Sequence, residues 1–198
     1  TLYGYVTAST GDTSLKGNWV SFSADDPSSL TKVAAGAEVA CAANADGVVY
    51  AYLKGGRQLV KINFKGEHYK YENVGAAGAN VIRTLAYDKK KNKLYGATAL
   101  KLFEIDMTTG KQTALNSSMY FGLGSGNMLN SIAADQNGNV YGLMGLGALC
   151  TLDPTTGTGA FVIDKNAAVD GKPSTVANNS MCFDKNDILF WASSTSSS

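Results

Sequence analysis

The stretch Lys93-Leu-Tyr-Gly-Ala-Thr98, followed by Leu102-Phe-Glu-Ile-Asp-Met-Thr-Thr-Gly110, decides how the chain folds. Its first half contains an aliphatic residue followed by an aromatic one. This pair recurs with the aromatic residue at positions 3, 50, 95, 141 and 190. The intervals between these positions are 47, 45, 46 and 49 residues. Such a regular recurrence is typical of a supersecondary unit that is repeated along a chain.

Each repeat is predicted to form four short strands. The first is apolar and ends at Asp or Asn, as in Ile132-Ala-Ala-Asp135, and the second carries the recurrent aromatic residue. The third alternates apolar and polar residues, and the turn Asp106-Met-Thr-Thr-Gly110 then leads to a weaker fourth strand at 112–116. Asp at the start of such a turn caps backbone N–H groups, and Gly at its end takes a positive φ.

A four-stranded unit of about 46 residues has the size of a β-propeller blade. One such sheet has two faces to bury, and blades stacked around an axis bury each face against a neighbour. Small residues in the first strands fit the crowded position next to the axis; these are Ala42, Ala86, Ala133 and Ala134. We therefore predict an all-β propeller built from four-stranded antiparallel blades.

The repeats predict one propeller domain over residues 1–198. They lie near 1–38, 39–80, 81–128 and 129–176, with a partial repeat at 177–198. The pattern gives 17 strands, one more than four complete blades contain. We expect an incomplete propeller of four or more blades that belongs to a larger one of about five to eight blades. A compact closed domain with irregular ends is the alternative.

Two stretches resemble known propellers. Lys93–Thr98 with Leu102–Gly110 resembles bacterial secreted propellers whose blades read LYxxD-x-TTG. Ile132-Ala-Ala-Asp-Gln-Asn-Gly-Asn-Val-Tyr141 is similar to the hairpin of NHL and virginiamycin-lyase-like propellers. The resemblance implies the fold and little about function, because such propellers include lyases, quinoproteins, scaffolds and carbohydrate-binding proteins. The lyases depend on a catalytic histidine, whereas the single histidine here, His68, falls in a predicted outer strand.

The composition argues against several classes of protein. Lys and Arg number 17 and Asp and Glu 16, so a strongly basic nucleic-acid binder is excluded. No apolar run approaches the roughly 18 residues of a membrane-spanning helix, and we expect no membrane insertion. The charged fraction of only 17% suggests an exported bacterial protein, at an extracellular, periplasmic or cell-surface location.

The sequence predicts no metal site, no cofactor and no catalytic residue. Cys41, Cys150 and Cys182 are scattered, and we interpret them as small buried hydrophobic residues. A Ser–His–Asp site needs a base that one peripheral histidine does not supply. The recurrent acids at the ends of the first strands are interpreted as turn caps; these are Asp88, Asp135 and Asp184.

A basic cluster occupies residues 89–93, in a predicted hairpin turn. We interpret it as a solvated turn, and an anionic partner is the alternative.

The candidate ligand site lies on the face made by the loops that enter the first strands. Its residues are Tyr120, Phe121, Arg83, Asn130, Asn179 and Trp191. The two aromatic residues of the long loop at 117–130 suit stacking on a sugar or another flat ligand. Alternatively they cover blade edges while the Asn side chains satisfy backbone groups. The tryptophan either lines this face or packs between blades.

The leading functional hypothesis is a non-enzymatic binding module that recognises a glycan or a protein partner through one propeller face. One alternative is a lyase-type or hydrolase-type propeller enzyme whose catalytic groups lie partly outside this chain. Another is a structural segment of a large adhesin.

Overall fold

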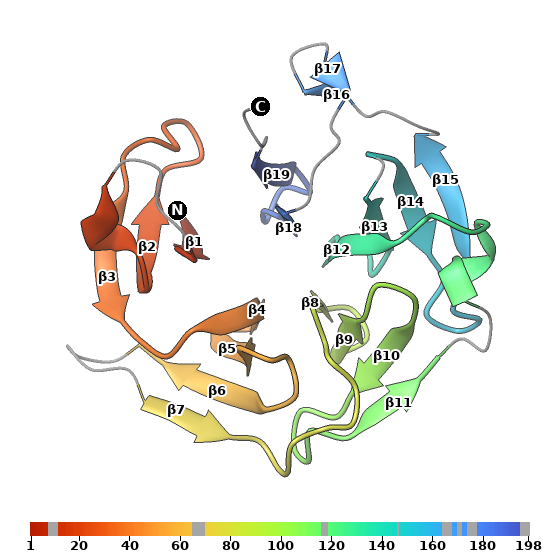
Figure 1. Cartoon of the computed structure of the whole chain (residues 1–198), viewed down its shortest axis with the longest axis horizontal. Coiled ribbons are helices and arrows are strands. Elements are labelled where there is room, and N and C mark those ends of the chain that lie inside the picture. Colours follow the sequence, from red (N-terminus) through yellow and green to blue (C-terminus); the bar gives the residue numbers. More distant parts are fainter. Residues whose placement is uncertain are drawn as a thin grey trace.

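The computed structural model describes residues 1–7, 12–64, 70–115, 119–145, 147–163, 168–169, 172–173 and 178–194. Its strands form separate antiparallel sheets arranged around one axis (Figure 1). The helical elements in this part of the chain are two short 3-10 helices, η1 (Thr13–Leu15) and η2 (Met119–Gly122). The prediction of an all-β propeller is confirmed.

We number the blades along the chain. Blade 1 contains β1 (Leu2–Tyr5), β2 (Asn18–Phe22) and β3 (Thr31–Ala35). Blade 2 contains β4 (Val39–Ala45), β5 (Val48–Leu53), β6 (Leu59–Asn63) and β7 (Lys70–Asn73). Blade 3 contains β8 (Thr84–Asp88), β9 (Lys93–Ala97), β10 (Leu102–Ile105) and β11 (Gln112–Ala114).

The order continues through two more blades. Blade 4 contains β12 (Leu129–Ala134), β13 (Val140–Met144), β14 (Leu149–Leu152) and β15 (Gly159–Ile163). Blade 5 is the hairpin of β18 (Asn178–Phe183) and β19 (Leu189–Ser194). A small hairpin of β16 (Ala168–Val169) and β17 (Lys172–Pro173), which the sequence pattern did not predict, lies between blades 4 and 5 in the chain. His68 lies outside the described residues.

The turns between third and fourth strands have the predicted chemistry. In blade 3, Asp106 Oδ1 accepts the backbone N–H groups of Thr108 and Thr109, both at 2.8 Å, and Gly110 has φ +71°. In blade 4, Asp153 accepts the backbone N–H of Thr155 at 2.8 Å and the hydroxyl of Thr156 at 2.9 Å, and Gly157 has φ +67°. The carboxylate satisfies N–H groups that the ladder leaves free, which is why the Asp-x-x-x-Gly pattern recurs.

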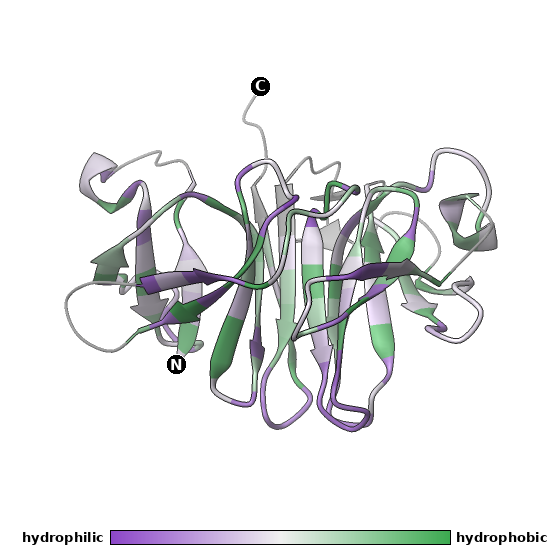
Figure 2. Cartoon of the chain, turned by 90° about the horizontal axis from the view of Figure 1, so that it is seen from below, coloured by the Kyte–Doolittle hydropathy of each residue, from purple (hydrophilic) through white to green (hydrophobic). Residues whose placement is uncertain are grey.

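Apolar side chains fill the space between successive blades. Phe121, which follows β11, is fully buried against Leu129 and Leu152 of blade 4 and Tyr95 of blade 3. Similar clusters join blades 2 and 3 and blades 4 and 5. In Figure 2, hydrophobic residues lie along the strands and hydrophilic ones gather in the turns at the lower edge.

Hydroxyl groups connect the innermost strands of neighbouring blades. Thr84 Oγ1 in β8 accepts the backbone N–H of Ile132 in β12 at 2.9 Å. Ser131 Oγ in β12 accepts the backbone N–H of Met181 in β18 at 3.0 Å. Both bonds are buried, and each pairs an N–H that would otherwise be costly to bury.

The second strands of blades 3 and 4 carry a glycine that is crowded from both sides. A Cβ added at Gly96 would lie 3.0 Å from Ile82 and 3.1 Å from Ile105. A Cβ added at Gly142 would lie 2.6 Å from Leu129 and 3.0 Å from the Cys150 sulfur. A residue in or just before the inner strand and a residue of the third strand therefore both pack over this position.

Trp191 occupies the corresponding position in β19, which pairs only with β18 among the described strands. Its side chain packs with the cluster that joins blades 4 and 5, near Ala133 and Leu143. Of the two predicted roles for this residue, the structure shows packing between blades.

Candidate functional site

The two ends of the channel between the inner strands differ. The turns that join first and second strands meet at one end, which we call the hairpin mouth; these are residues 46–47, 89–92, 135–139 and 184–188. The inner strands begin at the other end, which we call the entry mouth. Arg83, Asn130 and Asn179 lie there, at the starts of β8, β12 and β18.

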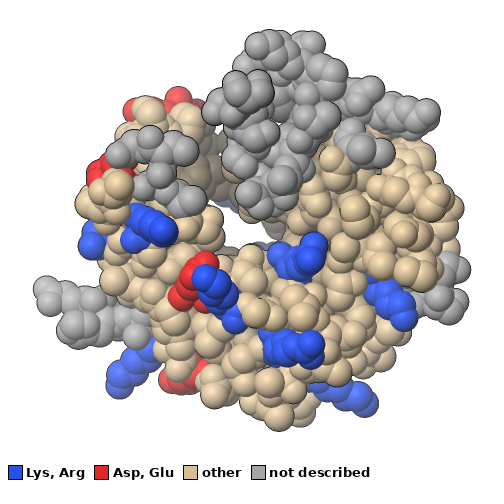
Figure 3. Space-filling view, in the orientation of Figure 1, with Lys and Arg blue, Asp and Glu red and all other residues tan. Residues whose placement is uncertain are grey.

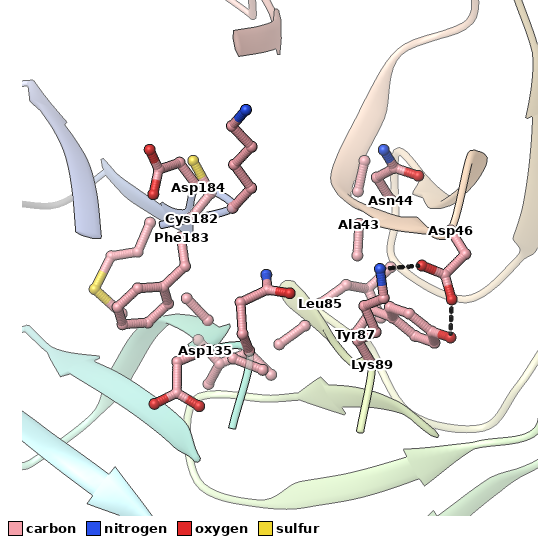
Figure 4. A pocket seen from close by; sticks show the side chains of 18 residues that line it. Ala43, Asn44, Asp46, Leu85, Tyr87, Lys89, Asp135, Cys182, Phe183 and Asp184 are labelled. Carbon is pink, nitrogen blue, oxygen red and sulfur yellow. Dashed lines mark hydrogen bonds and ion pairs between the residues drawn. The ribbon is translucent and has the colours of Figure 1, made fainter. Parts of the chain in front are cut away.

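A cavity of about 340 Å³ occupies the hairpin mouth (Figure 4). Its wall is formed largely by small residues of the inner strands, namely Ala42, Ala43, Ala86, Ala133 and Ala134. The prediction that alanines lie closest to the axis is therefore confirmed. Polar side chains from four hairpins form the rim; these are Asn44, Asp46, Lys89, Asp135, Gln136, Asp184 and Lys185.

The rim carboxylates are held in place by their own turns. Asp135 Oδ1 accepts the N–H groups of Asn137 at 3.0 Å and Asn139 at 2.8 Å. Asp184 Oδ1 accepts two N–H groups of the next turn, at 2.8 and 2.9 Å. The interpretation of these acids as turn caps is confirmed, and each carboxylate is fixed at the edge of the cavity.

Neighbouring hairpins are joined across the blade boundaries. Asp46 of blade 2 accepts the Tyr87 hydroxyl at 3.0 Å and lies 3.3 Å from the Lys89 ammonium (Figure 4). Desolvation, followed by the bond to Asp46, raises the pKa of Tyr87, so the phenol remains a donor at neutral pH. At the boundary between blades 4 and 5, Gln136 donates its backbone N–H to Asp187 at 2.7 Å. These contacts set the positions of the rim groups relative to one another.

The basic cluster at 89–93 is largely paired with acids. Besides the contact between Lys89 and Asp46, Lys91 lies 3.2 Å from buried Asp88, and Lys93 lies 2.6 Å from Glu104. The pairs of Lys89 and Lys93 are partly exposed and screened, so each contributes little to stability, whereas Asp88 is buried. On the face shown in Figure 3, basic side chains stand apart from one another over several blades.

Two aromatic rings line the cavity. Phe183 and Tyr87 are half-buried and come from different blades, on different sides of the cavity (Figure 4). The Phe183 ring also lies 5.2 Å from that of Tyr141, which fixes its orientation. The cavity thus combines apolar surface on its wall with hydrogen-bonding groups at its rim.

The three cysteines do not behave alike. Cys150 is buried and Cys41 half-buried, and desolvation raises the pKa of each thiol to about 12. Cys182 is exposed on the cavity wall, so its interpretation as a buried residue is wrong. Desolvation of its sulfur, followed by the charge of Asp184, still raises its pKa, which disfavours the reactive thiolate.

The two aromatic residues of the predicted ligand site, Tyr120 and Phe121, differ in their exposure. Phe121 has no exposed surface, because a positive φ of +56° turns it inward between blades 3 and 4. It therefore cannot offer its ring to a ligand. Tyr120 is half-buried.

At the entry mouth Arg83 is exposed and Asn130 half-buried, while the side chain of Asn179 lies outside the described residues. The structure thus places Arg83 and Asn130 at the predicted mouth.

The hairpin mouth was missed as a site by sequence reasoning. The signal was present, because every first strand ends at Asp or Asn and leads into a polar turn. Those residues were interpreted only as turn caps. Among the described residues, no group of three His, Cys, Asp or Glu side chains could hold a metal ion, and no helix has the length and apolar character needed to cross a membrane.

No protein-family model matches the sequence, and no curated protein matches it. Solved structures do match. A protein of unknown function from Bacteroides thetaiotaomicron has a TM-score of 0.60 and 16% identity, over 89% of this chain and 50% of that chain. The extracellular domain of a putative hybrid two-component system from that species has a TM-score of 0.52 and 16% identity, over 89% and 23%. A gluconolactonase from Xanthomonas campestris has a TM-score of 0.52 and 14% identity, over 89% and 62%.

These likenesses show a β-propeller fold shared with bacterial propellers. This chain spans less than two thirds of each of the three matched chains. The matched proteins include a gluconolactonase and the extracellular domain of a putative two-component system, so the fold alone does not select one function.

Proposed function

We propose that the protein is a non-catalytic binding module that takes the terminal sugar of a glycan into the cavity at the hairpin mouth. The observation that carries this proposal is the combination of an alanine-lined wall, two aromatic rings and a rim of fixed polar groups. Ligand pockets commonly join apolar surface with a few well-placed polar groups in this way.

The rim suits a neutral ligand rich in hydroxyl groups. Lys185 and the amide of Gln136 can donate hydrogen bonds, while Asn44 and Asp184 provide acceptor oxygens. A sugar hydroxyl both donates and accepts, so it can use both kinds of group. Because acidic and basic side chains alternate around the rim, a strongly charged ligand would meet repulsion from one of them.

The wall suits the apolar face of a sugar ring. Phe183 and Tyr87 provide aromatic surface, and the alanines leave space because their side chains are short. At about 340 Å³ the cavity lies near the lower end of the range of about 300–1,000 Å³ found for ligand pockets. It is therefore sized for one end of a glycan, with the remainder lying outside the mouth.

The state of the carboxylates favours binding over acid–base catalysis. Asp135 and Asp184 each accept two backbone N–H groups of their own turns, and these bonds hold the carboxylates in fixed orientations. Fixed acceptors are better suited to ligand recognition.

The proposal includes an exported or cell-surface location and a place among NHL-like propellers. The low charged fraction supports the location, and one matched structure is an extracellular domain. The hairpin at 132–141 resembles those of NHL and virginiamycin-lyase-like propellers, which supports the family assignment.

The test is titration calorimetry of the 198-residue chain with a panel of neutral monosaccharides and disaccharides. We expect one sugar class to bind, Gln136→Ala to weaken it about 5- to 10-fold, and Phe183→Ala about 10-fold. Thr113→Ala, on the exposed outer strand β11, is the matched control and should leave affinity unchanged.

Arg83→Ala decides between the two mouths. Loss of binding in this variant, with binding retained in Gln136→Ala, would move the site to the entry mouth and refute the proposal. If no sugar binds and a peptide binds at the same rim, the proposal that the ligand is a glycan is refuted.

A further inference from the structure

The hairpin turns of blades 4 and 5 share one five-residue pattern. Each begins with an aspartate, Asp135 or Asp184, whose Oδ1 accepts the N–H groups of the third and fifth residues of the turn. The fourth residue has a positive φ in both turns, +79° at Gly138 and +61° at Asp187. Glycine adopts this conformation freely, whereas a residue with a Cβ adopts it at a cost. Blade 5 therefore keeps a carboxylate at a position where blade 4 has glycine.

The Asp187 carboxylate bonds to the turn of the neighbouring blade. Its Oδ1 accepts the backbone N–H of Gln136 at 2.7 Å, and its Oδ2 lies 3.5 Å from the side-chain nitrogen of Asn137. Its backbone N–H is used within its own turn, where it is donated to the Asp184 carbonyl at 3.2 Å. Among the described residues, the side-chain bonds of Asp187 thus go to blade 4.

The bond from Gln136 completes the pairing of the blade 4 turn. Asp135 accepts the other three N–H groups of residues 136–139, two with its Oδ1 and that of Gly138 with its backbone carbonyl, at 3.1 Å. The N–H of Gln136 is paired by Asp187 instead. A bond of 2.7 Å from an N–H to a carboxylate is at the short, strong end of the usual range. Because Gln136 belongs to the rim of the cavity, Asp187 fixes the backbone from which this rim amide extends.

The same bond joins the two blades at the level of the cavity rim. Blades 4 and 5 are also connected along their inner strands, by the bond between Ser131 and Met181 and by a shared apolar cluster. At the hairpin mouth, Asp187 connects Gln136 to the turn that carries Lys185, another rim residue. The spacing between these two rim side chains therefore depends on Asp187.

We propose that Asp187 is a positioning residue of the ligand site, which fixes Gln136 of blade 4 relative to Lys185 of blade 5 so that both meet hydroxyl groups of one sugar. This inference rests on the proposed glycan-binding function. Holding both groups in place before the ligand arrives reduces the ordering that binding costs, and it makes affinity sensitive to the arrangement of the hydroxyl groups. Asp187 thus contributes to affinity and to selection among sugars through Gln136, without touching the ligand.

The first measurement needs no ligand and uses NMR-detected amide hydrogen exchange in the intact 198-residue chain. Asp187→Gly removes the carboxylate and supplies the residue that blade 4 has at this position. Its urea midpoint should change little, because relief of the backbone offsets the lost bond. Exchange at the Gln136 amide should accelerate about 10-fold or more, since its acceptor is gone. Asp187→Asn keeps an acceptor oxygen and tolerates a positive φ, so it should restore slow exchange.

The second measurement is calorimetry with methyl β-D-glucopyranoside, methyl β-D-galactopyranoside and methyl α-D-mannopyranoside. Asp187→Gly should weaken binding of the preferred sugar about 3- to 10-fold and reduce the preference among the three, whereas Asp187→Asn should stay within about 2-fold of the wild type. A residue that only stabilised its own turn would change the urea midpoint and leave the preference among sugars as it is. Thr113→Ala, on the outer strand β11, is the matched control in both measurements.

The two measurements separate this inference from the proposed function. Unchanged exchange at Gln136 in Asp187→Gly would refute the positioning role, whatever the sugars do. Faster exchange with unchanged sugar affinity would overturn it as well, because the bond would then not serve the site. If none of the three sugars binds the wild type, the glycan proposal fails for them, and the exchange result still decides whether Asp187 positions Gln136.

Discussion

The hydroxyl bond between β8 and β12 allows a quantitative test of how blades are joined. Thr84→Val keeps the shape of the side chain and removes the acceptor for the Ile132 N–H. Thr84 is 6% exposed and Ile132 1% exposed, so water cannot readily replace the hydroxyl. An unpaired buried donor costs about 1–3 kcal/mol. For a chain of this size that corresponds to a fall in Tm of about 2–12 °C.

The measurement is urea unfolding of the wild type and Thr84→Val, followed by fluorescence and circular dichroism. We expect a lower midpoint with an unchanged slope, because the variant exposes the same surface on unfolding. Hydrogen exchange at the Ile132 amide should accelerate more than exchange at amides within β9. Thr113→Val is the control, and its effect should stay within about 0.5 kcal/mol. Equal destabilisation in both variants would refute the assignment of this bond as a buried blade-to-blade connection.

Three further predictions follow from packing and electrostatics. Phe121→Ala should destabilise the fold by about 3–5 kcal/mol in urea unfolding, because the ring is fully buried between blades; an effect below about 1 kcal/mol would show that the ring is solvent-accessible. Gly142→Val should cost about 1–3 kcal/mol, because the new Cβ would begin 2.6 Å from Leu129, and a neutral effect in the same assay would contradict the close approach. The backbone bond from Thr109 holds the pKa of Asp106 below its usual value, so its stabilisation is complete above the unfolded-state pKa and is lost as the pH falls through the folded-state pKa. Asp106→Asn should therefore flatten the acid limb of a plot of stability against pH, and an unchanged limb would count against this carboxylate.

The repeat could be predicted because its signals are local. The recurrent aromatic residues, the Asp-capped turns and the alternation within Leu102–Ile105 each specify one strand or turn within a few residues. Asp106 and Gly110 determine their turn by bonds that span only three and four positions. The blade architecture is the sum of such local choices, so the pattern was sufficient for it.

The cavity could not be predicted in the same way because it depends on closure around an axis. Its rim joins Asp46, Lys89, Gln136 and Lys185, which lie on four hairpins separated by some forty to fifty residues. Each of these residues resembles an ordinary turn residue within its own repeat. Phe121 was misjudged for a different reason. An aromatic residue in a glycine-rich loop is expected to be exposed, and the sequence does not show the positive φ with which this ring is buried.

The arrangement of interfaces has a consequence for how the chain comes apart. Blades 2, 3 and 4 each share an apolar cluster with two neighbours, whereas each of blades 1 and 5 shares one, and no cluster of described residues joins blade 5 to blade 1. In such a linear array, opening begins where a unit has one neighbour and then propagates. The slowest hydrogen exchange should therefore lie in blade 3, and limited proteolysis should remove blade 5 before it cuts β8 or β12.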